Sequence, residues 1–279
     1  MAALTEIIRR PSVAGYAYPA APSLLREDIA RWLPDPPPAR MRATAAVVPH
    51  GSYARCGAVL GATLSRIEIP KRWIIIGPSH ADHRSRCRMM ASGAYRTPLG
   101  EVAIDDRLAD ALMRACSWIE ADEQAHAGEH AIEVVLPFLQ TLGPADATLL
   151  PLIFASDDPR DAAALGDALA DLVSDSPEPT LVIASTDLSH YRAEAQAARD
   201  DEALLGCLTA LDGDGLWPLA REQGIVMCGL SAAAAVLHAS RRLGATAGTV
   251  AGRATSVAAG GDPDSVIGYA GVIIHSRTT

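Results

Sequence analysis

The sequence predicts an α/β fold, a single-domain αβα sandwich around a mostly parallel mixed sheet that takes in residues 1–279. Short apolar runs alternate with longer helical segments along the chain, and this order places parallel strands between two layers of helices. No shift in composition marks a linker, and no internal repeat stands out. We therefore expect one domain.

The expected elements follow one another in the order that such a fold requires. The strands are expected at residues 44–48, 73–76, 147–154, 180–185, 246–257 and 265–274, with a hairpin within residues 87–104. The helices are expected at residues 24–33, 55–66, 105–116, 131–141, 159–173, 194–211 and 229–243.

Local sequence signals support these assignments. The proline-rich residues 34–38 end the first helix because proline has no N–H to continue it. Gly57 and Gly61 lie four residues apart in the second helix, which favours close packing on the sheet. Residues 73–76 are nearly all apolar, as a strand covered on both faces should be.

Charge and cysteine content exclude several classes of protein. The net charge of −9 argues against nucleic acid or an anionic membrane as the main partner, because both require clustered Lys and Arg. No apolar stretch has the length of a membrane helix, and residues 1–11 lack the pattern of a signal peptide. The five cysteines are widely spaced and odd in number, so we expect no disulfide framework and a reducing, cytoplasmic location.

Two histidines directly follow strand-like runs. His50 comes after the strand at residues 44–48, and His80 comes after the strand at residues 73–76. The carboxyl ends of parallel strands meet at one edge of a sheet, where ligands and catalytic groups gather. We therefore expect either a metal site or an acid–base cluster there, although a single histidine at a strand end is often only structural.

Polar residues also follow the strand at residues 180–185. Asp187 and His190 lie three residues apart, so the carboxylate could orient the imidazole and make it a better base. The alternative is that this segment only caps the next helix.

A His-x-x-Glu-His segment is formed by His126, Glu129 and His130 before an apolar helix. On one helix the two histidines would share a face, as in zinc peptidases with the inverted motif. No convincing third ligand is evident in the sequence. The alternative is that Glu129 caps the helix at residues 131–141.

Cys228 precedes a helix, and a helix N-terminus lowers the pKa of a thiol, which favours a thiolate nucleophile or soft metal ligand. Three further cysteines, Cys56, Cys116 and Cys207, are expected to be buried core residues. No GxGxxG, GxxxxGK[ST] or GxSxG motif supports nucleotide binding or serine-hydrolase chemistry.

These segments, taken in order, resemble the MEMO family, also called AmmeMemoRadiSam system protein B. The segments that carry the resemblance are residues 10–19, 49–50, 77–80, 97–102, 129–139, 187–191, 228–229 and 265–270. The resemblance covers nearly the whole chain and implies a fold similar to class III extradiol dioxygenases.

The resemblance also implies a pocket in which two histidines and a cysteine bind iron or copper. On this chain the implied ligands are His50, His80 and Cys228, with Asp187 and His190 close by. The pocket is also expected to include Glu129, His130 and Tyr53.

Two departures from the family pattern affect the pocket rather than its ligands. Gly51-Ser52 replaces the usual Ala-Gly, with Arg55-Cys56 where smaller residues are usual, and no proline follows Cys228-Gly229.

The sequence thus predicts a mononuclear Fe(II) or copper site for redox or dioxygenase-type chemistry on a small molecule. His190, oriented by Asp187, would transfer protons. One alternative is a non-catalytic protein that binds metal or a peptide, or protects against oxidation. Another is a thiol hydrolase that uses Cys228 and His190.

Overall fold

In the computed structural model, which describes residues 7–81 and 86–276, twelve strands of the described chain join one sheet. Its path runs β1-β5-β6-β8-β3-β9-β2-β12-β10; β11 pairs with β12, and β4 pairs with β7 and β8. The strands are β1 (Ile8–Arg9), β2 (Ala45–Val48), β3 (Arg72–Gly77), β4 (Cys87–Met89), β5 (Ala94–Thr97), β6 (Gly100–Ile104), β7 (Ile119–Ala121), β8 (Thr148–Phe154), β9 (Thr180–Ser185), β10 (His190–Arg192), β11 (Ala247–Thr255) and β12 (Val266–His275).

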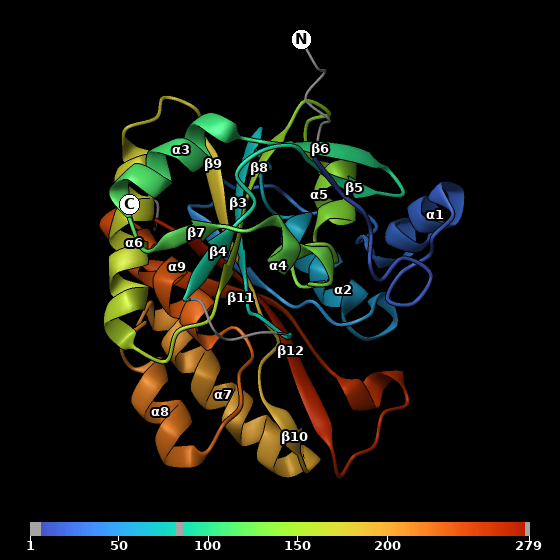
Figure 1. Cartoon of the computed structure of the whole chain (residues 1–279). Helices are drawn as coiled ribbons and strands as arrows, with labels where there is room; N and C mark the ends of the chain where they lie inside the picture. The colour runs from blue at the N-terminus through green and yellow to red at the C-terminus, as the bar shows by residue number, and fades with distance from the viewer. Residues whose placement is uncertain (1–6, 82–85, 277–279) are drawn as a thin grey trace.

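Helices cover both faces of the sheet, with α6 and α9 on one side and α1, α2 and α5 on the other (Figure 1). The helices are α1 (Pro22–Trp32), α2 (Tyr53–Leu64), α3 (Asp106–Ala115), α4 (Glu123–Ala127), α5 (Leu136–Leu142), α6 (Pro159–Ser174), α7 (Glu194–Ala210), α8 (Leu216–Gln223) and α9 (Leu230–Arg242), with a 3-10 turn at Ser256–Ala259. The predicted αβα arrangement and mixed sheet are confirmed. None of the helices in the described ranges is long and apolar enough to cross a membrane.

The sheet separates two apolar cores. Val47 and Ile76 pack in the core that contains α6 and α9, whereas Val48 and Ile75 pack in the core that contains α2 and α5. Successive strand residues point to opposite faces, so the apolar residues of β2 and residues 73–76 of β3 fill both cores.

The central strands β3, β9 and β2 are neighbours and run parallel. Their carboxyl ends therefore lie at the same edge of the sheet, as the sequence predicts. The loops that leave β2, β3 and β9 carry His50, His80 and Asp187.

Two local expectations were wrong. The helix predicted at residues 131–141 begins only at Leu136, because residues 131–135 form turns and Pro137 favours the first turn of a helix. Gly57 and Gly61 pack against Trp32 at the end of α1 rather than against the sheet.

We expect Gly61→Ala to lower the free energy of unfolding by about 1–3 kcal/mol, because overpacking moves well-packed neighbours. A Cβ at Gly61 would lie 2.0 Å from the backbone oxygen of Trp32. Gly206 in α7 is the matched control because a Cβ there meets nothing within 4 Å. Gly206→Ala should raise stability by about 0.5–1 kcal/mol. Equal denaturant midpoints for the two variants would contradict this packing.

Candidate metal centre

His50 is held in one orientation by the end of β9. Its Nδ1 lies 3.0 Å from the Ser185 hydroxyl, and that hydroxyl lies 2.7 Å from the carbonyl oxygen of Ala131. The hydroxyl donates its one proton to the carbonyl, so it must accept from Nδ1–H of His50. Nε2 of His50 therefore keeps its lone pair. Burial lowers the pKa of His50 to about 4, so the ring is neutral at neutral pH.

His80 is oriented in the same sense by Glu129. The two carboxylate oxygens of Glu129 accept from Nδ1 of His80 at 2.9 Å and from its backbone N–H at 2.8 Å. Burial alone would raise the pKa of Glu129, but the hydrogen bonds and charge of His80 lower it to about 2. The carboxylate thus leaves Nε2 of His80 as the free ring nitrogen, an arrangement typical of histidines that bind metals.

Cys228 precedes Gly229, the N-cap residue of α9, and its Sγ is 3.4 Å from Nε2 of His50. Gly229 allows this approach, because a Cβ there would lie 2.6 Å from Cβ of Thr186. The Gly229 N–H donates to the Thr186 hydroxyl at 2.8 Å. Burial and then the charge of Asp187 raise the pKa of Cys228 to about 12. The expected lowering by the helix N-terminus was therefore wrong, since burial outweighs it.

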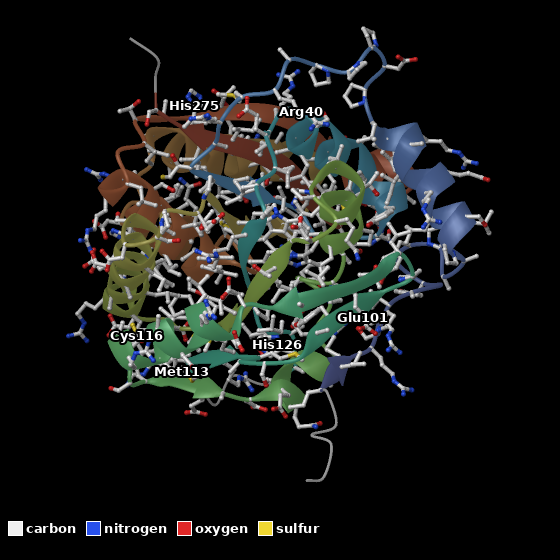
Figure 2. The ribbon with its side chains drawn as sticks, turned by 90° about the horizontal axis from the view of Figure 1, so that it is seen from above. Arg40, Glu101, Met113, Cys116, His126 and His275 are labelled. Carbon is white, nitrogen blue, oxygen red and sulfur yellow. The ribbon has the colours of Figure 1, made fainter. Side chains whose placement is uncertain are left out.

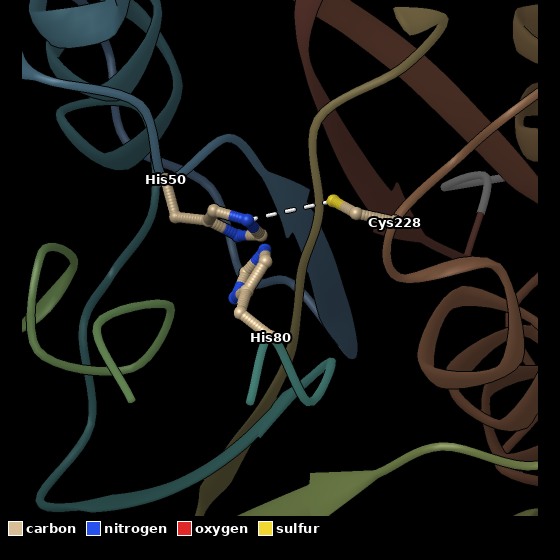
Figure 3. Close-up of side chains that lie close together, drawn as sticks. All are labelled: His50, His80 and Cys228. Carbon is tan, nitrogen blue, oxygen red and sulfur yellow. Dashed lines mark hydrogen bonds between the residues drawn. The ribbon is translucent and has the colours of Figure 1, made fainter. Parts of the chain in front are cut away.

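Two overlapping groups have ligand atoms that all lie within 4.8 Å of one another. One is His50, His80 and Cys228, and the other is His80, Glu129 and His130. Figure 3 shows the first group converging from separate segments. Glu129 in the second group already accepts from His80 and from the Ala131 N–H at 2.8 Å. The first group is therefore the better cation site. His130 lies next to this group, with its ring centroid 4.5 Å from that of His80.

Asp187 and His190 have partners other than each other. Oδ1 of Asp187 accepts from the backbone N–H of His50 at 2.9 Å. Nδ1 of His190 lies 2.9 Å from the carbonyl oxygen of Leu188 and 3.1 Å from that of Val226. Asp187 thus fixes the loop that carries His50, and backbone carbonyls orient His190.

Two other candidate residues lie elsewhere: Tyr53, which was expected in the pocket, and His126, which belongs to the His-x-x-Glu-His segment. Tyr53 is buried, and its hydroxyl donates to the carbonyl oxygen of Val134 at 2.9 Å. His126 is in α4 whereas His130 follows the helix, so the two do not share a helix face. Nδ1 of His126, the residue labelled in Figure 2, lies 2.6 Å from the Tyr95 hydroxyl. The zinc-peptidase interpretation of this segment was wrong.

A cavity of about 570 Å³ opens beside the imidazoles. His50, His80, His130, Asp187 and His190 line it. A second cavity of about 580 Å³ is lined by Cys228 together with residues of α8 and α9. The candidate metal centre therefore lies where the two cavities approach each other, with imidazoles facing one and the thiol facing the other.

A buried ion pair, which no local sequence pattern indicates, holds the segment that carries Glu129. The Arg9 guanidinium pairs with Glu133 and donates to the carbonyl oxygen of Glu129 at 2.5 Å. The Tyr18 hydroxyl donates to the Glu133 carboxylate at 2.5 Å. Burial alone would raise the pKa of Glu133, but Arg9 and these donors hold it below its ordinary value.

Comparison with known proteins identifies the family of this chain. The family model described as "Memo-like protein" matches residues 9–273. The chain belongs to the Memo-like family. It is 36% identical to a MEMO1 family protein of Methanopyrus kandleri, over 96% of this chain and 99% of that protein. It is 30% identical to a MEMO1 family protein of Aquifex aeolicus, over 95% of this chain and 98% of that protein.

A solved structure supports the fold of this Memo-like chain. An uncharacterized protein of Escherichia coli K12 matches it with a TM-score of 0.51 and 15% identity. The match covers 83% of this chain and 99% of the other. At this identity the likeness concerns the fold alone.

We expect Arg9→Met to lower the free energy of unfolding by about 3–5 kcal/mol, because it leaves the buried Glu133 carboxylate without its countercharge. Arg9→Met combined with Glu133→Gln should recover part of this loss. Lys71→Met, which breaks the exposed pair with Asp146, is the control and should change stability little. Denaturant unfolding checks all three. An additive double variant would contradict direct coupling of Arg9 and Glu133.

Proposed function

We propose that this chain holds one iron or copper ion with His50, His80 and Cys228 and uses it for redox or oxygen-dependent chemistry on a small molecule. The observation that carries the proposal is the convergence of three ligand atoms, in which both histidines engage Nδ1 elsewhere and keep Nε2 free.

The donor set fits a redox-active transition metal. Imidazole suits iron, copper and zinc, and a thiolate shifts the preference toward softer ions such as copper. Three protein donors leave coordination positions for a substrate or for oxygen. A bound ion of this kind would supply electron transfer and polarisation of its ligands.

The surrounding residues prepare the site for a substrate. Ser185 and Glu129 orient the two imidazoles, and Asp187 fixes the His50 loop. His190 lines the same cavity and is the candidate for proton transfer, because histidine is the side chain that most often transfers protons in catalysis. Cys228 must stay reduced to bind the ion, which fits the cytoplasmic location expected from the cysteines.

A second candidate function is non-catalytic binding of metal together with an extended ligand such as a peptide. The exposed Tyr16 and Tyr191 at the cavity favour it, since exposed aromatic rings often contact ligands. The thiol-hydrolase alternative has less support. The imidazole nearest Cys228 is His50, and the raised pKa of the thiol disfavours a free thiolate.

We expect anaerobically purified protein to bind one iron or copper ion per chain, and His50→Ala or His80→Ala to lose stoichiometric metal. His275→Ala is the control, because His275 lies at the end of β12 and pairs with Thr249. Elemental analysis after removal of free metal checks this. Full retention of the ion in His50→Ala would refute the ligand assignment. Bound metal with no oxygen uptake across small-molecule substrates would favour the binding function.

We expect Ser185→Ala to weaken metal affinity about 10- to 100-fold, because it removes the group that keeps Nε2 of His50 free. The measurement is competition with a chelator of known affinity. Ser240→Ala in α9 is the matched control, since its buried hydroxyl donates to the carbonyl oxygen of Val236. Unchanged affinity in Ser185→Ala, with intact thermal unfolding, would contradict this role.

A further inference from the structure

We propose that the cavity beside the imidazoles recognises an organic anion, and that Arg55 binds the carboxylate or phosphate group of that ligand. The inference deepens the proposed function and rests on it, because it names the substrate class of the same cavity. It comes from the charges that line the cavity wall.

Arg55 is an exposed cation in the first turn of α2, and it lines the cavity. None of the ion pairs between described residues includes Arg55. Its polar neighbour is the Tyr269 hydroxyl, which also lines the cavity. The guanidinium therefore keeps donors for a planar anion, which arginine binds with two parallel hydrogen bonds.

The rest of this wall also favours negative charge. Ser52 precedes α2 without a side-chain capping bond, and the first turn of α2 contains no acidic residue. The positive end of the helix thus adds to the charge of Arg55. Asp187 is the one carboxylate among the described lining residues, and its Oδ1 accepts from the His50 N–H.

The remaining lining residues indicate the chemistry of the part of the ligand that lies away from its anionic group. Val13 and Ile267 provide apolar surface, and Tyr16 and Tyr191 are 90% and 70% exposed. Tyr191 has a φ of 60°, a left-handed conformation that costs energy for a residue with a side chain. An apolar or aromatic body with an anionic group at one end and a metal-binding group at the other matches this lining.

The test uses benzohydroxamate, a neutral metal-chelating probe, and its 3- and 4-carboxy and 4-phosphono derivatives. Calorimetry on metal-loaded protein measures the affinity of each. We expect the phosphono derivative, or the tighter-binding of the two carboxy derivatives, to bind about tenfold more tightly than the neutral probe. Arg55→Gln should abolish this preference. Arg66→Gln, an exposed charge just after the other end of α2, should keep it.

The same variants are compared without metal, using NMR titration with benzoate and benzamide. Tighter binding of benzoate than of benzamide that depends on Arg55 supports the anion site even if no metal binds. This measurement therefore distinguishes failure of the metal assignment from failure of the anion site. Equal affinity of neutral and charged probes for metal-loaded wild type would overturn the proposal. An anion preference that survives in correctly folded Arg55→Gln would also overturn it. The carboxylate and phosphonate arms identify the anion that is favoured.

Discussion

Three consecutive residues at the carboxyl end of β9 hold the candidate metal centre together. Ser185 fixes the proton of His50, Thr186 accepts the N–H of Gly229 next to the thiol, and the Asp187 carboxylate binds the backbone of His50. β9 pairs with both β2 and β3, so its end lies between the two histidine loops. The parallel sheet therefore holds in place candidate metal ligands that lie far apart in the sequence.

Hydrogen-bond direction, rather than proximity alone, makes the imidazole pair suitable as ligands. Each ring uses Nδ1 for a protein acceptor, a hydroxyl for His50 and a carboxylate for His80. Each therefore presents the same nitrogen. In the other tautomer, Nε2 would carry the proton and present no lone pair. The site would then lose a metal ligand without any change in the fold.

The sequence predicted a mostly parallel sheet between helices and the convergence of His50 and His80, because both follow from strand–helix alternation and from parallel pairing. The order of the strands in the sheet was not predicted. Cys228 was also correctly placed near them through the family resemblance. The raised pKa of that thiol was not predicted, because it depends on burial by segments that only the folded chain brings together.

Other features depend on contacts between distant segments. Arg9 and Glu133 are separated by 124 positions, and no local pattern links them. The role of Ser185 depends on a third group, the Ala131 carbonyl, which uses the hydroxyl proton. The late start of α5 could have been read from Pro137, since proline commonly opens a helix.

The unequal burial of the two histidines has a consequence for how an ion would enter. The side chain of His80 is 36% exposed, whereas His50 is only 2% exposed and lies against the thiol. An ion that arrived through the cavity beside the imidazoles would meet the outer ring first and reach the inner nitrogen only after shedding water. Loading from this side would then proceed in stages, and departure would be governed by the slow release of the inner imidazole.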